Sequence, residues 1–245
     1  MYRAIKQLLK RIIPARLLYI LEPVFRRILY LFYSGHDFQC NVCGKGLRVF
    51  ISLPDGGQLC PNCGSISRNR RLFDLLQAEY LTDGLRVLDF SPSRCLYRAM
   101  KKMPDILYTG TDYAGEFLSD KNYDITDLEV DNEAYDLVIC YHVLEHVEND
   151  LQAMKELYRV LAKPGTCIIQ TPFKEGDTYE NPAVKTAEER LKHFGQNDHV
   201  RIYSLKGLEE RLSACGFKVE IRNYAEHENN VSGYKGRETI LLCRK

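Results

Sequence analysis

Beyond residue 84 the chain alternates between strand-like and helix-like patterns of apolar residues. Helical spacing is clearest at 149–161 and 204–214. Continuous apolar runs, which are typical of buried strands, lie at 86–90, 106–111, 135–141, 165–171, 217–224 and 238–244. This alternation predicts an α/β fold with a largely parallel sheet. The last two runs are joined by a short non-helical link at 229–237, which predicts that they are antiparallel neighbours.

A basic amphipathic arm, residues 1–35, precedes this body. Its first helical face is formed by Ile5, Leu8, Leu9, Ile12 and Ile13. Pro14 interrupts that pattern, and a second apolar run follows Pro23. Residues 1–33 carry seven Lys and Arg and one acidic residue, a net charge of +6, whereas the other 212 residues carry −5. We therefore expect the arm either to lie in the headgroup layer of an anionic membrane or to pack on protein.

Composition limits the class of protein and its compartment. With 245 residues, 45% of them hydrophobic, the chain can form one catalytic domain and a small module, and it is not disordered. No stretch of 18 uncharged apolar residues occurs, and charged residues interrupt each candidate signal-peptide core. An odd number of cysteines, nine, favours a reducing compartment over a disulfide framework. We therefore expect a cytoplasmic protein.

Four of the cysteines form two CxxC pairs in the segment 36–67. Cys40, Cys43, Cys60 and Cys63 have the spacing C-x2-C-x16-C-x2-C, and a glycine follows each pair. This pattern predicts a structural zinc ion in a zinc ribbon, two knuckles joined by a hairpin, with no open coordination position. The alternative is a pair of redox-active CxxC motifs. The basic residues Arg68, Arg70 and Arg71 follow directly and either contact nucleic acid or open an amphipathic helix.

Asp112 ends the second predicted strand, 23 residues after Asp89. An acidic side chain at that place can hold two ribose hydroxyls of a nucleotide-like cofactor. Several segments in the same order resemble the motifs of class I S-adenosylmethionine-dependent methyltransferases of the type 11 kind: VLDF at 87–90, GTDY at 110–113, YDIT at 123–126, YDLVICYHVLEHV at 135–147 and LAKPGT at 161–166.

That resemblance implies a Rossmann-like methyltransferase domain at 68–245. Its sheet would be mostly parallel and seven-stranded, with an antiparallel C-terminal hairpin, and S-adenosylmethionine would be its cofactor. By the same resemblance, Asp112 holds the ribose, Tyr113 lies beside the adenine, and Asp124 accepts from the adenine amino group. Ile125 packs on the adenine ring, and Tyr141 and His142 line the methionine portion.

The first loop departs from the family, because it contains no glycine. The expected cofactor residues there are Asp89, Phe90, Ser91, Ser93 and Arg94. Either a side chain such as Arg94 or Ser93 reaches the cofactor carboxylate in place of backbone, or cofactor binding is weakened.

His142 and His199 are the candidate catalytic bases, because a neutral imidazole accepts a proton near physiological pH; His146 is the next candidate. Each of them can instead have a structural role. The letters H-x-x-E-H at 142–146 also match a zinc-peptidase motif, which we reject because His142 directly follows a strand run. Arg201 either holds an acidic substrate or pairs with Asp198, and the polar insertion 174–195 is the expected substrate lid.

The expected function is methyl transfer to an oxygen or nitrogen atom of a small-molecule or glycan-type substrate. One alternative is a zinc-ribbon scaffold protein with a degenerate methyltransferase domain. Another is an RNA methyltransferase, although a nucleic-acid partner is not favoured because the body is net acidic.

Overall fold

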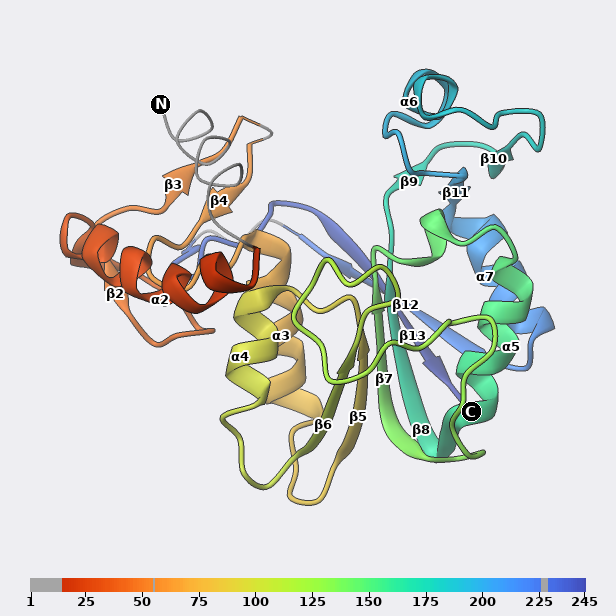
Figure 1. Cartoon of the computed structure of the whole chain (residues 1–245), viewed down its shortest axis with the longest axis horizontal. Coiled ribbons are helices and arrows are strands. Elements are labelled where there is room, and N and C mark those ends of the chain that lie inside the picture. The colour runs from red at the N-terminus through yellow and green to blue at the C-terminus, as the bar shows by residue number, and fades with distance from the viewer. Residues whose placement is uncertain (1–14, 55, 226–228) are drawn as a thin grey trace. The chain divides into compact units, whose positions relative to one another are not determined.

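The computed structural model describes residues 15–54, 56–225 and 229–245 (Figure 1). The chain forms two compact units. The first comprises residues 1–75 and 226–236, and the second comprises 76–225 and 237–245. We describe each unit by itself.

The second unit is built on a six-stranded sheet with the order β12-β13-β8-β7-β5-β6. Its strands are β5 (Arg86–Phe90), β6 (Leu107–Thr111), β7 (Tyr135–Tyr141), β8 (Leu161–Gln170), β12 (Lys218–Tyr224) and β13 (Glu238–Arg244). The four strands β6, β5, β7 and β8 are parallel, and β13 and β12 are antiparallel. The predicted Rossmann-like α/β architecture with a C-terminal hairpin is confirmed.

The expectation of seven strands is wrong for the described part of the chain. Residues 112–134 contribute only the isolated bridges Thr111–Lys121 and Asp124–Asp127. The strand β11 (Arg201–Ser204) pairs with β9 (Phe173–Lys174) and β10 (Tyr179–Glu180) in a separate small sheet. Neither segment adds a strand to the main sheet of the described residues.

The core explains why the central strands have continuous apolar runs. Leu137, Val138, Ile139 and Cys140 of β7 are at most 1% exposed, because the strand lies in the middle of the sheet. The helix α5 (Asp150–Val160) covers one face with Ala153, Met154, Leu157 and Val160, spaced as one helical stripe. Asn149 caps this helix by accepting a hydrogen bond from the Gln152 amide.

Parallel pairing brings three loops to one edge of the sheet. Phe90 is in register with Thr111 on β6 and with Cys140 on β7. The segments that begin at Ser91, Asp112 and His142 therefore leave the sheet side by side. The helices α4 (Arg94–Met100) and α7 (Leu205–Ala214) complete the layers of this unit.

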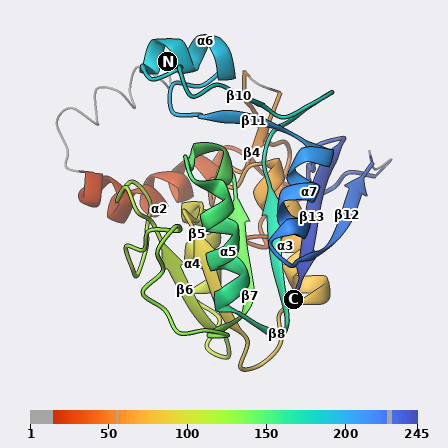
Figure 2. The ribbon, with the colours of Figure 1, turned by 90° about the vertical axis from the view of Figure 1, so that its right-hand side faces the viewer.

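The predicted lid lies beyond the carboxyl end of β8 (Figure 2). It carries β10 and the helix α6 (Ala187–Phe194), which begins with a capping box between Thr186 and Glu189 and ends at Gly195 with a φ of 82°.

The first unit contains the helix α2 (Ala15–Leu31) and two short hairpins. One pairs β1 (Ser34–Gln39) with β2 (Gly46–Leu47), and the other pairs β3 (Ile51–Ser52) with β4 (Gln58–Leu59). The helix continues through Pro23, where we expected a new run to begin. The predicted amphipathic stretch at residues 5–13 lies outside the described residues. Among residues 15–54, 56–225 and 229–245, no helix combines the length and apolarity that crossing a membrane requires.

Candidate functional site

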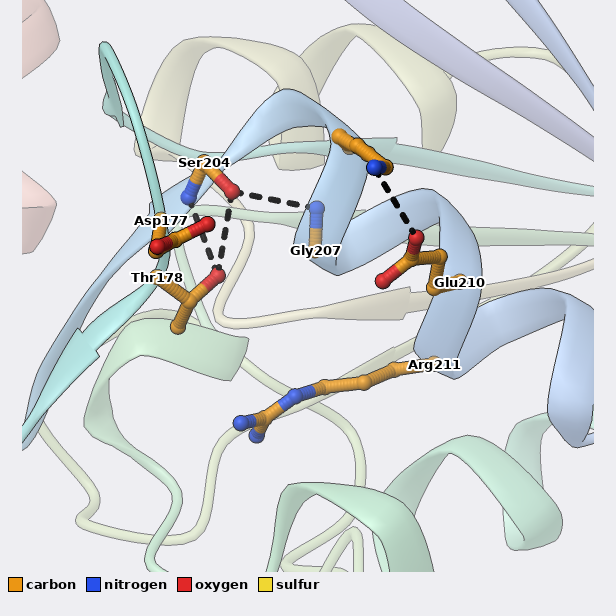
Figure 3. A pocket seen from close by; sticks show the side chains of 7 residues that line it. Asp177, Thr178, Ser204, Gly207, Glu210 and Arg211 are labelled. Carbon is orange, nitrogen blue, oxygen red and sulfur yellow. Dashed lines mark hydrogen bonds and ion pairs between the residues drawn. The ribbon is translucent and has the colours of Figure 1, made fainter.

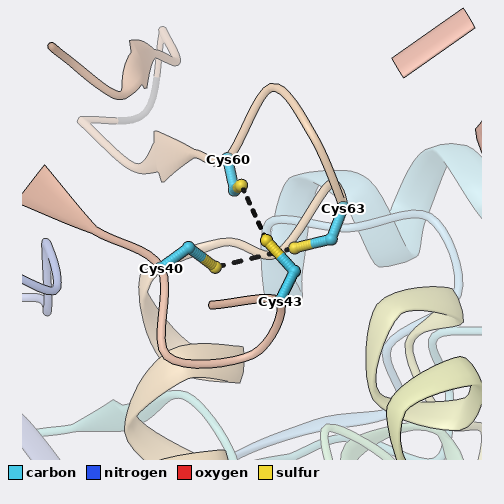
Figure 4. Close-up of side chains that lie close together, drawn as sticks. All are labelled: Cys40, Cys43, Cys60 and Cys63. Carbon is cyan, nitrogen blue, oxygen red and sulfur yellow. Dashed lines mark hydrogen bonds between the residues drawn. The ribbon is translucent and has the colours of Figure 1, made fainter. Parts of the chain in front are cut away.

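Four sulfur atoms gather at the two CxxC turns of the first unit (Figure 4). The Sγ atoms of Cys40 and Cys63 are 3.6 Å apart, and those of Cys43 and Cys60 are 3.8 Å apart. Zinc–sulfur bonds of about 2.3 Å in a tetrahedron place the sulfurs about 3.8 Å apart. The cluster is therefore compatible with a zinc ion.

Both cysteine turns have the same backbone construction. The amide of Gly44 donates to the Cys40 carbonyl, and the amide of Gly64 donates to the Cys60 carbonyl. Both glycines have a positive φ, 69° and 79°, which L side chains rarely adopt. Hydrogen bonding with Cys40 and the other thiols, together with burial, raises the pKa of Cys63. Four sulfurs held this close form a donor set that fits a cation, whose charge would balance the thiolates.

Arg70 connects the cysteine turns to a distant loop of the same unit. Its guanidinium is fully buried and donates to the carbonyls of Ser65, Gln58, Ser232 and Gly233. Arg71 is 2% exposed and stacks on the ring of Tyr234, 3.9 Å from its centroid. The basic run therefore lies at the start of the helix α3 (Ser67–Glu79). Because Arg70 and Arg71 are buried, only Arg68 of the three arginines is exposed.

In the second unit, the loop after β5 makes a tight turn without glycine. Ser91 has a φ of 47°, in the left-handed region, which costs a non-glycine residue roughly 1–2 kcal/mol. The Ser91 hydroxyl donates to Asp112 Oδ1 at 2.9 Å. The amides of Glu116 and Phe117 donate to Asp112 Oδ2 at 2.6 and 3.0 Å. Ser91 thus adopts the backbone conformation that glycine provides elsewhere, and Asp112 is fixed at the edge of the sheet.

Asp89 lies deeper, one residue before the end of β5. It is 3% exposed, and its Oδ2 accepts a hydrogen bond from the Tyr108 hydroxyl at 2.9 Å. Burial raises the pKa of Asp89 to about 7. The carboxyl group is therefore poised between its neutral and ionised forms near neutral pH.

The other predicted cofactor residues are dispersed. Tyr113 is 68% exposed, whereas Phe90 and Ile125 belong to the hydrophobic core. Asp124 Oδ1 accepts hydrogen bonds from the amide and hydroxyl of Thr126, which is a local turn. Ser93 is the N-cap residue of α4, and Arg94 is its first residue. The structure thus brings Ser91 and Asp112 into contact and leaves Tyr113 facing solvent.

Three histidines and a glutamate meet where β7 ends. His142, with a φ of 56°, places its Nδ1 3.1 Å from Glu145 Oε1. Glu145 and His146 belong to the 3-10 helix η1 (Leu144–His146). The rings of His146 and His199 meet edge to face with centroids 4.7 Å apart. The two predicted bases therefore belong to one cluster, in which His199 is 4% exposed and has its pKa lowered by burial and by the charge of His146.

Arg201 has neither of the two roles expected for it. Its guanidinium is buried and donates to the carbonyls of Leu144, Val147 and Glu148, which belong to η1 and the residues just after it. Its Nε donates to Glu180 Oε2 at 2.9 Å. Asp198 instead pairs with His146, with its Oδ2 3.4 Å from Nδ1. Arg201 therefore holds the η1 turn in place and is not available to an acidic substrate.

Sequence reasoning overlooked Glu145 as a functional residue. It treated this glutamate as the opening of a helix, whereas the residue is buried and its carboxylate lies close to His146 and His199. A glutamate between two histidines directly after a buried strand was the signal that could have identified it.

A small hollow of about 270 Å³ lies at the start of α7 (Figure 3). The amide of Gly207 donates to Ser204 Oγ, which is 3.4 Å from Thr178 Oγ1, and Lys206 pairs with Glu210. These polar groups satisfy one another, and none of the predicted cofactor residues lines the hollow.

The chain is similar to solved methyltransferase structures. A SAM-dependent methyltransferase from Archaeoglobus fulgidus matches 74% of this chain and 95% of its own, with 17% identity and a TM-score of 0.52. A chain of the complex between the Haloferax volcanii Trm112 methyltransferase activator and a putative methyltransferase matches 71% of this chain and 87% of its own, with 15% identity and a TM-score of 0.50. At this identity the likeness shows the fold alone. No curated protein matches the chain by sequence.

A family model described as a methyltransferase domain matches residues 66–220. That range covers well over half of the chain and includes both the contact between Ser91 and Asp112 and the turn with Glu145 and His146. The chain therefore belongs to the methyltransferase domain family.

Proposed function

We propose that this protein transfers a methyl group from S-adenosylmethionine to an oxygen or nitrogen atom of a small molecule or glycan intermediate in the cytoplasm. The contact between Ser91 and Asp112 at the carboxyl edge of the parallel sheet carries the proposal. It combines the tight turn that a bound cofactor requires with a fixed carboxylate that can accept from ribose hydroxyls. A degenerate scaffold would not need to keep a strained serine against a buried aspartate.

The bound cofactor would supply an electrophilic methyl group on a sulfonium. Asp112 would hold the ribose, Asp124 the adenine amino group, and Tyr141 and His142 the methionine portion. His142 would act as the base: because a carboxylate only accepts, Nδ1 donates to Glu145, and the lone pair of the neutral ring lies on Nε2. Burial acts to raise the pKa of Glu145, but the hydrogen bond from His142 lowers it, and the pKa stays below its ordinary value.

Replacing Asp112 with alanine should weaken S-adenosylmethionine binding about 10- to 150-fold. Losing a hydrogen bond to a charged group costs roughly 1.5–3 kcal/mol. Titration calorimetry measures this loss. Asp127→Ala, which removes an exposed carboxylate from the same region, should bind like the parent. Parent protein that binds no S-adenosylmethionine would favour the scaffold alternative, and equal binding by Asp112→Ala would remove Asp112 from the site.

Arg94→Met should reduce affinity for S-adenosylmethionine and leave affinity for 5′-methylthioadenosine unchanged. The second ligand lacks the carboxylate that Arg94 would hold from the first residue of α4. A charge-assisted contact of this kind corresponds to roughly a tenfold loss or more. The matched control is Arg98→Met, one turn further along the same helix. Equal losses for both ligands would show a distorted loop, and no loss for either would exclude Arg94.

The first unit would contribute a structural zinc ion at Cys40, Cys43, Cys60 and Cys63, and a surface for an anionic membrane. The helix α2 and the residue after it expose six large apolar side chains, each at least half exposed: Ile20, Val24, Phe25, Ile28, Leu31 and Phe32. Such a face, in a segment whose residues 1–33 carry a net charge of +6, fits anionic lipid headgroups better than it fits water.

The protein should therefore sediment with vesicles that contain phosphatidylglycerol, and less with vesicles of phosphatidylcholine alone. Replacing both Phe25 and Phe32 with serine should lower partitioning at least about tenfold, because burying one such ring contributes roughly 1.5–3 kcal/mol. Val231→Ser, at another exposed apolar residue of the first unit, is the control. Sedimentation that is unchanged by the double substitution would show that this face does not contact lipid.

A further inference from the structure

The cluster at the end of β7 has the donor atoms of a metal centre. Glu145, His146 and His199 each offer one ligand atom, and these atoms all lie within 4.8 Å of one another. Ligand atoms of a tetrahedral zinc ion lie about 3.4 Å apart, because its bonds to nitrogen and oxygen are about 2.1 Å long. Small side-chain rotations would therefore close this group around an ion.

Glu145 has a buried oxygen that no group of the described residues satisfies. The side chain is 2% exposed, and its Oε1 is held by His142. Its Oε2 is buried and has no hydrogen-bond partner in the part of the chain that the structure describes. A buried carboxylate oxygen without a donor is costly, so a ligand that binds it is favoured. The position of this carboxylate beside two imidazole rings identifies that ligand as a cation.

The backbone around the cluster is fixed from both sides. The amide of Val200 donates to the carbonyl of Glu145 at 2.9 Å, which joins the segment of His199 to η1. Arg201, the next residue, binds carbonyls at both ends of the same turn. The ligands come from chain segments more than 50 residues apart, yet they are held by one hydrogen-bond network.

Asp198 supports the cluster from outside. Its Oδ2 lies 3.4 Å from His146 Nδ1, and its side chain is 60% exposed. Metal-bound histidines commonly have a carboxylate on one ring nitrogen, which fixes the orientation of the ring. The His146 side chain is 33% exposed, so an ion can enter from solvent on that side.

We propose that Glu145, His146 and His199 bind a divalent transition-metal ion, with His142 and Asp198 orienting the ligands. Two imidazoles and one carboxylate form the donor set of catalytic zinc sites, which keep a coordination position for water or substrate. This arrangement also explains why the H-x-x-E-H letters do not form a peptidase site. His142 contacts the glutamate, and the third ligand is His199 from a distant segment.

The use of this ion rests on the proposed function. The first ligand, Glu145, follows His142 by three residues, and Tyr141 and His142 would line the methionine portion of the cofactor. An acceptor oxygen bound at the open position would lie near that cofactor and would have its pKa lowered by the ion. The inference therefore narrows the acceptor to a molecule with a metal-binding oxygen, such as a hydroxyl group.

The test uses Co²⁺ as the probe and the full-length protein with zinc retained at its cysteines. Cobalt held by imidazole and carboxylate absorbs in the visible region without the strong sulfur-to-cobalt band that thiolates produce, so the two sites are distinguished. One equivalent of Co²⁺ should bind without S-adenosylmethionine. This readout is therefore independent of methyl transfer, and an inactive protein that binds cobalt would contradict only the proposed function.

Variants of the cluster should lose cobalt affinity to different extents. Asp198→Asn should lower cobalt affinity roughly 10- to 100-fold, as outer partners of metal ligands do. His146→Asn, His199→Asn and Glu145→Gln should each lower it further. His193→Asn, at an exposed histidine of α6, should bind like the parent. The side chain of His146 is only partly buried, so the His146→Asn variant should fold. It therefore keeps the test valid if the Glu145→Gln variant does not fold. No cobalt binding by the parent, or binding unchanged in both histidine variants of the cluster, would overturn the proposal.

Discussion

Removing zinc from the cysteine module should unfold the first unit while the parallel sheet of the second unit remains folded. The sulfurs of Cys40, Cys43, Cys60 and Cys63 already have the separation that zinc imposes, and the unit has few other apolar residues to bury. Structural zinc sites of small domains contribute about 10–16 kcal/mol of apparent binding free energy. The second unit has its own core around Leu88, Val138 and Leu157. Hydrogen exchange at residues 36–66, measured before and after chelation of zinc, reports the loss of structure in the first unit.

Cys43→Ser should reproduce the effect of chelation and lower the zinc content by one ion per chain. Cys215→Ser, at a cysteine outside the cluster, should leave both zinc content and exchange unchanged. Native protein whose four clustered thiols react freely, while residues 36–66 stay protected from exchange, would contradict a structural zinc ion.

Arg70→Met should destabilise the first unit by about 3–5 kcal/mol. The guanidinium is fully buried, and its loss leaves the carbonyls of Gln58, Ser65, Ser232 and Gly233 without this donor. Chemical denaturation, monitored through hydrogen exchange at residues 229–236, measures the change in the stability of the first unit.

Arg68→Met is the matched control, because Arg68 lies on the same helix and is exposed. A surface substitution of this kind usually changes stability by less than about 0.5 kcal/mol. If the two methionine variants unfold at the same denaturant concentration, Arg70 does not hold the loop.

The sequence predicted those parts of the fold whose cause is local. The continuous apolar runs at 86–90, 135–141 and 238–244 coincide with β5, β7 and β13, because buried strands need apolar side chains on both faces. The cysteine spacing predicted the sulfur cluster for a similar reason, since each turn forms its own knuckle.

The features that sequence reasoning missed depend on distant contacts or unusual backbone. A left-handed conformation at Ser91 or His142 is invisible in a sequence, because these residue types rarely adopt it. The buried role of Arg70 was not predicted, because its acceptors Ser232 and Gly233 are remote in the sequence. The place of Asp112 at the edge of the sheet could therefore be predicted, because it follows its own strand. The proximity of His199 to His146 could not, because His199 comes from another segment.

The contacts of Arg70 impose an order on folding during synthesis. Its acceptors Ser232 and Gly233 lie 162 and 163 residues further along the chain. At roughly 5–20 residues per second, a ribosome needs about 8–30 s to make that stretch. The two cysteine turns can close around zinc as soon as residue 63 has emerged, because only sixteen residues separate them. The cysteine module is therefore synthesised before the second unit and completed after most of it: zinc would hold the module through the interval, and the loop before β13 would finish it.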